Sequence, residues 1–467
     1  MWGQAALPLA LLLVTPHDPS VLTTISCLSD SYRGQFGGNS VFIVDDACLS
    51  SSTGLLGEGS VVPLDDTDRQ LVWLEQEVVE DTLGLPSPED ITSFISALSG
   101  SPFTAQDGEQ QVLADSLYGN VVLAETASSM VISVAPEVAR TIDTHLPRFW
   151  KSAPIPPKSV PYVPISSAAS QRVKEIAASV KFDPVVASIV GNLSITQMRK
   201  DVRYLTGEDP SSGIVSRHAF SEGALQAAAW LKEQFESTGA SCELKPFLRG
   251  FSPNVVCTYA ATEDTTETML LSAHYDSRGS FGSTRAPGGD DDGSGTTALL
   301  AIARTIARKG VTFRKNIQLV AFSGEEQGLY GSKAYAREMY ELGANLTLMI
   351  QADMLGYHAP GEPAQLGLPA SIGSVEVMQL VSNISAIYSP ELVVGTTRAC
   401  CSDHQSFHEL GFPATQVFER AGPIADPMYH NSGDLSDREG YDFGQVRSIA
   451  KVQFATLLHA AGFDLPE

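Results

Sequence analysis

The stretch NIQLVAFSGEEQG, residues 316–328, joins a run of apolar residues to two adjacent carboxylates, Glu325 and Glu326. The apolar run predicts a buried strand, and the glycines that follow predict a turn into a helix. Successive side chains of a strand face opposite ways, but both can line one cleft where the strand ends and the chain turns. A Glu pair beside a glycine is more often a solvated turn. Its interpretation therefore depends on other segments of the chain.

One such segment is the apolar run 268–275, which predicts a second buried strand. His274 and Asp276 lie at its end, on the same side of the chain. A metal-bound histidine commonly gives its other ring N–H to a carboxylate, and Asp276 is well placed for that role. The glycine-rich turn APGGDDDGSG, residues 286–295, follows and carries three consecutive acids into a predicted helix. It lacks the regular acid spacing of an EF-hand.

Two later segments carry the same residue types. The apolar run 346–352 ends in Asp353. The segment MYHNSGD, residues 428–434, supplies a second histidine, His430, with Asp434 nearby. Segments far apart in the sequence therefore end in side chains that bind metals.

Together these segments resemble a known family. The blocks AHYDS, APGGDDDGSG, GEEQGLYGS, QADM, CCSDHQSFH and MYHNSGD are similar, in order and roughly in spacing, to those of the M28 zinc aminopeptidases, most of all to secreted fungal peptide hydrolases and bacterial leucyl aminopeptidases. The resemblance covers about residues 197 to 465. It implies a three-layer αβα domain of the phosphorylase/hydrolase-like zinc peptidase fold, with a mixed, mostly parallel sheet.

The resemblance also implies two zinc ions bridged by Asp291, the middle acid of the triplet. One zinc would add His274 and Asp353, and the other would add Glu326 and His430. Zinc accepts both nitrogen and carboxylate oxygen ligands, so the residue types agree with this assignment.

Further roles follow from the same resemblance. The peptide bond between Asp291 and Asp292 would be cis, and Glu325 would be the general base that moves the proton of the attacking water. Asp276 and Asp434 would not bind the metals themselves but would orient the ligands through hydrogen bonds.

The implied activity is removal of N-terminal residues from peptides that have a free amino terminus. Met354 and Phe418 are candidate apolar walls of the substrate pocket. Two alternatives are a glutaminyl-cyclase-like acyltransferase on the same fold, which would use a single zinc, and a catalytically silent binding protein of M28 descent. A silent protein would be expected to lose ligands or the base, and here all six positions are filled.

Six cysteines, an even number, are typical of a secreted protein with disulfides. Cys242 and Cys257 fall on the runs 241–247 and 254–259, which predict a hairpin, and Cys27 and Cys48 would form another pair.

The adjacent Cys400 and Cys401 leave three possibilities open: a vicinal disulfide, one external pairing, or two free thiols. In the same segment His404 and His408 are more typical of hydrogen-bonding or core residues, and both stay outside the predicted ligand set.

Other features favour secretion. The apolar run 5–14 suits a signal peptide, predicted over residues 1–20, and is too short to span a membrane. Asn192, Asn345 and Asn383 each open a glycosylation sequon. The formal net charge of −24 argues against nucleic acid as a partner. We expect a monomer without a membrane span.

The chain divides at a proline-rich stretch. Residues 21–150 mix short β-like runs with turns and predict a smaller α+β accessory domain or pro-domain. Residues 151–170 predict a semi-rigid linker, and residues 171–467 predict the peptidase domain. No internal repeat is evident. Within the peptidase domain, the run 221–239 predicts a helix whose inner face carries Leu225, Ala228, Leu231 and Phe235. The runs 294–310 and 441–461 predict two more helices.

Overall fold

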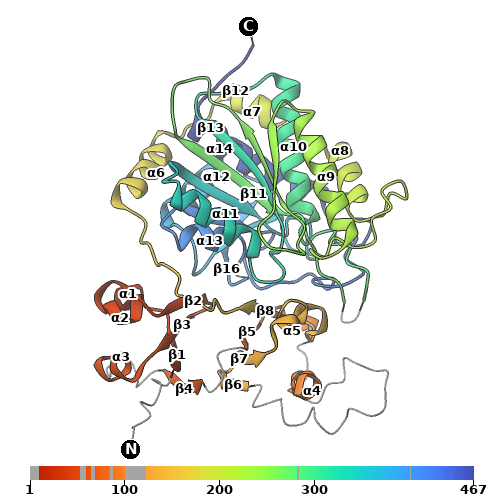
Figure 1. Ribbon diagram of the computed structural model, residues 1–467. Coiled ribbons are helices and arrows are strands. Elements are labelled where there is room, and N and C mark those ends of the chain that lie inside the picture. The colour runs from red at the N-terminus through yellow and green to blue at the C-terminus, as the bar shows by residue number, and fades with distance from the viewer. Residues whose placement is uncertain are drawn as a thin grey trace, which may run out of the picture. The chain divides into compact units, whose positions relative to one another are not determined.

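The computed structural model of the chain describes residues 10–52, 59–64, 69–84, 88–99, 122–280, 283–399 and 401–466. The chain forms two compact units (Figure 1). The smaller unit comprises Met1–Glu77 and Leu85–Tyr162, and the larger comprises Val78–Gly84 and Val163–Glu467.

The larger unit is built on a six-stranded mixed sheet. In spatial order the strands are β17 (Ala414–Val417), β14 (Leu346–Ala352), β11 (Thr268–His274), β13 (Asn316–Phe322), β10 (Asn254–Tyr259) and β9 (Ser241–Lys245). The first four are parallel to one another, whereas β10 and β9 pair antiparallel at one edge. The predicted mixed, mostly parallel α/β sheet is therefore confirmed.

Side chains of the central strands alternate between two apolar cores. In β11, Met269 and Leu271 enter one core while Leu270 enters the other, and all three are fully buried. The same alternation holds in β13 and β14. Strands buried on both faces read as continuous apolar runs, which is why the sequence pattern located them.

Helices cover both faces of this sheet (Figure 1). The first core receives α6 (Ser167–Ser179), α7 (Pro184–Val190), α8 (Ile195–Leu205), α9 (Glu222–Glu236), α10 (Gly293–Lys309), α12 (Val375–Tyr388) and α14 (Phe443–Ala461). The second core receives α11 (Tyr330–Glu341) and α13 (His404–His408). Two small sheets complete the unit: β12 (Thr312–Phe313) with β18 (Phe463–Asp464), and β15 (Gln365–Pro369) with β16 (Val393–Thr397).

The three helices expected from apolar spacing are present, and their ends follow capping rules. The side chain of Ser221 accepts the N–H of Ala224 at the start of α9, and Gly310 ends α10 with φ +64°. The predicted inner face of α9 was wrong at Leu225, which is 47% exposed. Ala224 and Ala227 are buried instead, because small side chains allow close packing on that face.

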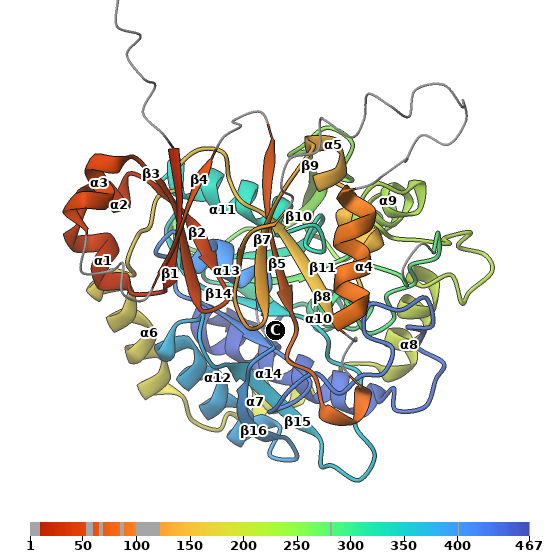
Figure 2. The same ribbon diagram turned by 90° about the horizontal axis from the view of Figure 1, so that it is seen from below.

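The smaller unit consists of two four-stranded antiparallel sheets, each flanked by its own helices (Figure 2). The first contains β1 (Ala10–Pro16), β2 (Tyr32–Phe36), β3 (Asn39–Val44) and β4 (Ser60–Leu64), with α1 (Pro19–Thr24), α2 (Ser26–Ser29) and α3 (Asp46–Ser51). The second contains β5 (Gln70–Gln76), β6 (Val122–Glu125), β7 (Ser129–Val134) and β8 (Trp150–Pro154), with α4 (Pro88–Ser99) and α5 (Pro136–Ala139).

These two halves repeat one topology. Their strand orders are β2-β3-β1-β4 and β6-β7-β5-β8, so corresponding strands of the two β-α-β-β-α-β modules occupy the same places. The sheets face each other across a shared core in which the rings of Phe36 and Trp73 stack with centroids 5.6 Å apart. The sequence showed no repeat, because many different side chains satisfy the same alternating pattern of burial.

Strand β1 lies within the segment predicted as a signal peptide. It lies inside its sheet, paired with both β3 and β4, and Leu11 to Val14 are at most 5% exposed. Cleavage near residue 20 would remove this strand and leave β4 without its paired strand, whereas β3 would still pair with β2. An apolar run of this length suits a buried strand as well as a signal sequence, and the signal peptide stays a prediction.

The first residues of the predicted linker, 151–154, belong to a strand of the smaller unit. Residues 150–154 form strand β8 at the edge of the second sheet, where proline is tolerated because no neighbour needs its N–H. The two units divide after Tyr162. No helix among the residues described above combines the length and apolar character needed to cross a bilayer.

Two predicted disulfides are confirmed. Cys27 bonds Cys48, and Cys242 bonds Cys257 across the β9–β10 hairpin. Cys401 is disulfide-bonded, and Cys400 lies outside the described residues.

Helix α9 offers a matched test of the corrected packing face. Leu231 is fully buried and Leu225 is 47% exposed, so the same substitution can be made on both faces of one helix. We expect Leu231→Ala to lower the free energy of unfolding by about 2–5 kcal/mol, and Leu225→Ala to change it by less than about 0.5 kcal/mol. Urea unfolding of the two variants measures the difference. Equal losses would show that the assigned face is wrong.

Candidate metal centre

The candidate site lies where parallel strands of the large sheet end. His274 is the last residue of β11, Glu326 follows β13, and Asp353 follows β14 directly. Asp291 lies in the turn before α10, and His430 lies between β17 and α14. Binding sites of open α/β sheets form at this edge, because the loops leaving parallel strands meet there.

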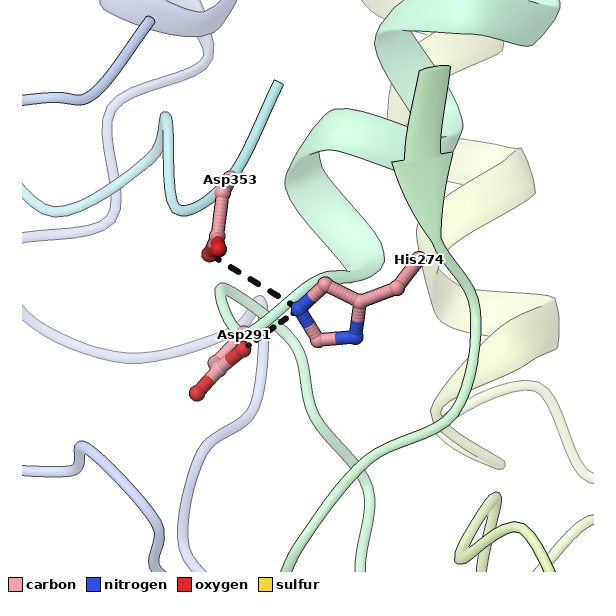
Figure 3. Close-up of side chains that lie close together, drawn as sticks. All are labelled: His274, Asp291 and Asp353. Carbon is pink, nitrogen blue, oxygen red and sulfur yellow. Dashed lines mark ion pairs between the residues drawn. The ribbon is translucent and has the colours of Figure 1, made fainter. Parts of the chain in front are cut away.

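The first group contains His274, Asp291 and Asp353. The Nε2 atom of His274 lies 3.2 Å from Oδ1 of Asp291 and 3.7 Å from Oδ1 of Asp353. Figure 3 shows the imidazole directed at both carboxylates.

The second group shares Asp291. The Nε2 atom of His430 lies 3.2 Å from Oδ2 of Asp291 and 3.0 Å from Oε2 of Glu326. In each group the possible ligand atoms all lie within 4.8 Å of one another. Asp291 thus presents one oxygen to each histidine.

Unpartnered atoms indicate what these groups can hold. His274 Nε2 and Glu326 Oε1 are buried and have no hydrogen-bond partner. Buried polar atoms are almost always satisfied, and a divalent cation would satisfy these two. The imidazole and carboxylate donors suit zinc. The residues present therefore fit the metal pair that the sequence resemblance implied.

Asp292 ties three parts of the site together. Its carboxylate accepts the backbone N–H groups of His274 (3.0 Å), Gly295 (2.9 Å) and Met354 (3.2 Å). It thereby joins the end of β11, the start of α10 and the residue after Asp353. The peptide bond between Asp291 and Asp292 is cis, as the resemblance implied.

Asp276 supports both neighbouring strand ends. Its carbonyl oxygen lies 3.2 Å from His274 Nδ1, and its carboxylate lies 3.6 Å from the same nitrogen. The carboxylate also accepts the N–H groups of Glu325 and Glu326, each at 3.3 Å. A hydrogen on Nδ1 leaves Nε2 of His274 available to a metal.

Asp434 contacts the acid triplet, although the sequence placed it beside His430. Its carboxylate accepts the N–H groups of Asp290 and Asp291, each at 3.0 Å. Arg438 bonds Asp434 at 3.1 Å and also forms an ion pair with Asp426. Asp434 therefore orients the backbone that carries Asp291.

His430 has neighbours that sequence reasoning missed. Its Nδ1 lies 3.0 Å from Nη1 of Arg278, and its ring stacks on Tyr429 with centroids 3.8 Å apart. His430 and Met354 adopt φ of +50° and +52°, which is uncommon for residues other than glycine. Such strained positions cluster at functional sites.

The charges of the site favour bound cations. Burial would lower the pKa of His274, but Glu325 and other nearby carboxylates outweigh burial and raise that pKa well above its usual value. Burial likewise opposes protonation of His430, yet Glu326 and Asp291 raise its pKa to about 9. Burial raises the pKa of Glu325 well above its usual value.

The remaining predicted residues lie nearby but form no ligand group. Met354 and Phe418 are 2% and 1% exposed, and the N–H of Glu419 donates to the carbonyl of Met354 at 2.9 Å. Their role as pocket walls stays a prediction. His404 is buried beside the carbonyl of Ile372, and burial lowers its pKa to about 3, so it is neutral.

Comparison with known proteins adds to this geometry. A sequence model described as peptidase family M28 matches residues 254–456, which include both groups and Glu325. The larger unit contains an M28 peptidase domain. The protein is therefore a peptide hydrolase, of a family that generally depends on metals.

Several curated relatives of this chain are fungal enzymes. A probable leucine aminopeptidase of Arthroderma otae is 29% identical over 290 residues, covering 59% of this chain and 76% of the relative. Leucine aminopeptidase 1 of Coccidioides posadasii is 27% identical over 297 residues, covering 59% and 74%.

Solved structures share the fold. The LapA aminopeptidase of Legionella pneumophila superposes with a TM-score of 0.58 at 17% identity, over 85% of this chain and 99% of that one. LapB from the same organism superposes with a TM-score of 0.59 at 17% identity, over 83% of this chain and 100% of LapB. The superpositions cover 85% and 83% of this chain, which is more than the residues of the larger unit alone. The likeness in fold therefore extends into the smaller unit.

Asp276 allows a test of indirect support. We expect Asp276→Ala to weaken metal affinity or activity by about 10- to 100-fold, because the groups that orient ligands usually contribute that much. Chelator competition measures the affinity. The control is Asp264→Ala, at an exposed position of the same unit. An Asp276 variant that matches the control would exclude the supporting role.

Proposed function

We propose that this protein is a secreted aminopeptidase that uses two zinc ions to remove N-terminal residues from peptides. The observation that carries the proposal is the pair of buried groups sharing Asp291, whose two oxygens each lie 3.2 Å from a different histidine. A carboxylate used in this way suits a two-metal hydrolase, in which the ions lie about 3.5–4 Å apart. Both groups are complete, which favours this function over a cyclase with a single zinc.

Five residues of the chain would bind the two ions. Asp291 would bridge the ions; His274 and Asp353 would complete one coordination sphere, and Glu326 and His430 the other. Two bound zinc ions would polarise the scissile carbonyl and acidify a water molecule.

Glu325 would serve as the general base. It adjoins Glu326 but belongs to neither group, and its N–H is fixed by Asp276. It would accept a proton from the attacking water and return it to the departing amine.

The exopeptidase assignment rests on the names of the fungal relatives, and one assay tests it. We expect cleavage of a leucyl reporter with a free amine and no cleavage of its N-acetylated form, with two zinc ions per chain by metal analysis. Cleavage of both reporters would indicate an endopeptidase. Cyclisation of a glutaminyl peptide with one zinc would indicate the cyclase, and no turnover with metal bound would indicate a silent binding protein.

Glu325→Gln tests the base. The amide keeps the shape of the side chain but cannot accept the proton, so we expect kcat to fall by about 100-fold or more while zinc content stays close to that of the wild type. Glu338→Gln, on helix α11, is the matched control. A Glu325 variant that keeps more than about a tenth of the wild-type rate would contradict the role.

Asp291→Ala tests the bridge. Because one carboxylate would serve both ions and offset their repulsion, we expect this variant to lose both zinc ions, whereas Asp353→Ala should lose affinity mainly at one position. Metal analysis after dialysis compares the two. Retention of two zinc ions by Asp291→Ala would exclude bridging.

Secretion and glycosylation remain parts of the proposal. The two disulfides with both partners described support an oxidising compartment. Of the three sequons, Asn192 is exposed, Asn345 is partly buried directly before β14, and Asn383 is partly buried within helix α12. Asn192 is therefore the favoured acceptor.

We also propose that the N-terminal region is a pro-region that blocks the cleft or assists folding until it is cut. The segment Val78–Gly84 complicates its release, since it belongs to the larger unit. Val79 bridges Ile424, the N–H of Glu80 donates to the Ile424 carbonyl at 2.7 Å, and Arg420 binds the Glu80 carboxylate at 2.8 Å.

A cut at one exposed site separates the possibilities. Residues 157–159 are exposed between the last strand of the smaller unit and Tyr162, so a specific protease site can be placed after Lys158. A pro-region predicts that cleavage raises the aminopeptidase rate. Unchanged activity with both pieces still associated would favour a permanent accessory domain. Protein without the inserted site, treated with the same protease, is the control.

A further inference from the structure

Arg217 is a fully buried cation between two segments of the candidate site. It lies between α8 and α9, and its side chain donates four hydrogen bonds to backbone carbonyls. Nε bonds Tyr275 at 2.7 Å, and Nη2 bonds Gly288 at 2.7 Å. Nη1 bonds Pro287, and also Leu205 at 3.1 Å at the end of α8.

The backbone of Arg217 contacts the same two segments. Its N–H donates to the carbonyl of Ala286 at 3.0 Å, and its carbonyl accepts the N–H of Ser277 at 3.3 Å. Side chain and backbone together therefore join residues 275–277 to the glycine-rich turn 286–288.

Each of these two segments lies close to a proposed ligand in the sequence. Tyr275 directly follows His274, and the turn at Gly288 leads into Asp291. Gly288 has φ +54°, and a Cβ at this position would lie 2.9 Å from Nη2 of Arg217 and 2.4 Å from Cβ of Ser277. The turn thus requires glycine so that it can approach the guanidinium. The contact joins the segment that follows His274 to the turn that leads into Asp291.

The charge of Arg217 also bears on the site. Burial lowers the pKa of its guanidinium, and the nearby Asp434, Asp292, Asp276 and Asp291 oppose that effect. An arginine remains charged even when buried. Its positive charge therefore helps to offset the carboxylates that are concentrated here.

We propose that Arg217 is a positioning residue of the metal centre, holding the end of β11 and the glycine-rich turn at the separation that lets His274 and Asp291 bind one ion. This inference rests on the proposed function. Lysine cannot substitute, because its compact ammonium has three donors and lacks the planar fork that reaches several carbonyls at once.

Two variants and a matched control test the proposal in the full-length protein. Arg217→Lys keeps the charge and loses the fork, and Arg217→Met loses both. The control is Arg304→Met, which removes a largely buried arginine of the same unit that bonds Asp201 at 3.0 Å. Competition between each protein and a zinc chelator measures affinity, and calorimetry of the metal-free proteins measures stability.

We expect zinc affinity to fall about 10- to 100-fold in Arg217→Lys, and further in Arg217→Met, with little change in Arg304→Met. At saturating zinc, kcat of the Arg217 variants should fall while KM stays within about twofold, since the ligands rather than the substrate contacts are displaced. A merely structural arginine would lower the stability of the metal-free protein, as in the control, without moving zinc affinity.

The outcomes separate this inference from the function on which it rests. If the wild type binds no zinc, the proposed function fails. If the wild type binds zinc and the folded Arg217 variants bind it equally well with the same kcat, the positioning role is wrong. If neither Arg217 variant folds even with excess zinc, Arg217 is required for the fold itself, and the positioning role is likewise rejected.

Discussion

The constraint on which the larger unit depends is the burial of many carboxylates in one place. Asp290, Asp291, Asp292, Asp276 and Asp434 are all at most 6% exposed. Buried charges are costly unless they are paired and hydrogen-bonded. The fold satisfies most of these acids with backbone N–H groups, and two buried atoms without a hydrogen-bond partner, His274 Nε2 and Glu326 Oε1, belong to the groups that could hold a metal.

This arrangement explains why the site is built from turns and strand ends. Backbone N–H groups inside a sheet are used by neighbouring strands, whereas those just beyond a strand are free to bind carboxylates. Asp276 takes the N–H groups of Glu325 and Glu326 there, and Asp292 takes that of Met354. Arg217 takes backbone carbonyls of two other segments, at Tyr275 and at residues 287–288. The acids thus satisfy backbone N–H groups and the arginine satisfies backbone carbonyls around the site, and the turns gain a defined geometry.

The smaller unit buries its apolar surface in three cores. Two β-α-β-β-α-β modules share one core between their sheets and keep separate cores under their helices. A single module of this size would bury little apolar surface alone. Pairing the sheets provides a third core, and the likeness to LapA and LapB over more than four-fifths of the chain includes part of this unit.

The sequence by itself determined the strands, the main helices and the residues gathered at the site. Continuous apolar runs located β11, β13 and β14 and drew attention to the acids and histidine that follow them. The resemblance to M28 peptidases, also carried by the sequence, named the ligand set. Tertiary structure decided what depends on partners distant in sequence. The run at residues 10–14 became a strand because β3 and β4 flank it, and Leu225 faces solvent because alanines pack beneath α9. Asp434 supports Asp291, and Arg217 joins two turns, through contacts that no local pattern encodes. Local periodicity reports which faces are apolar, but only the folded chain determines which groups meet.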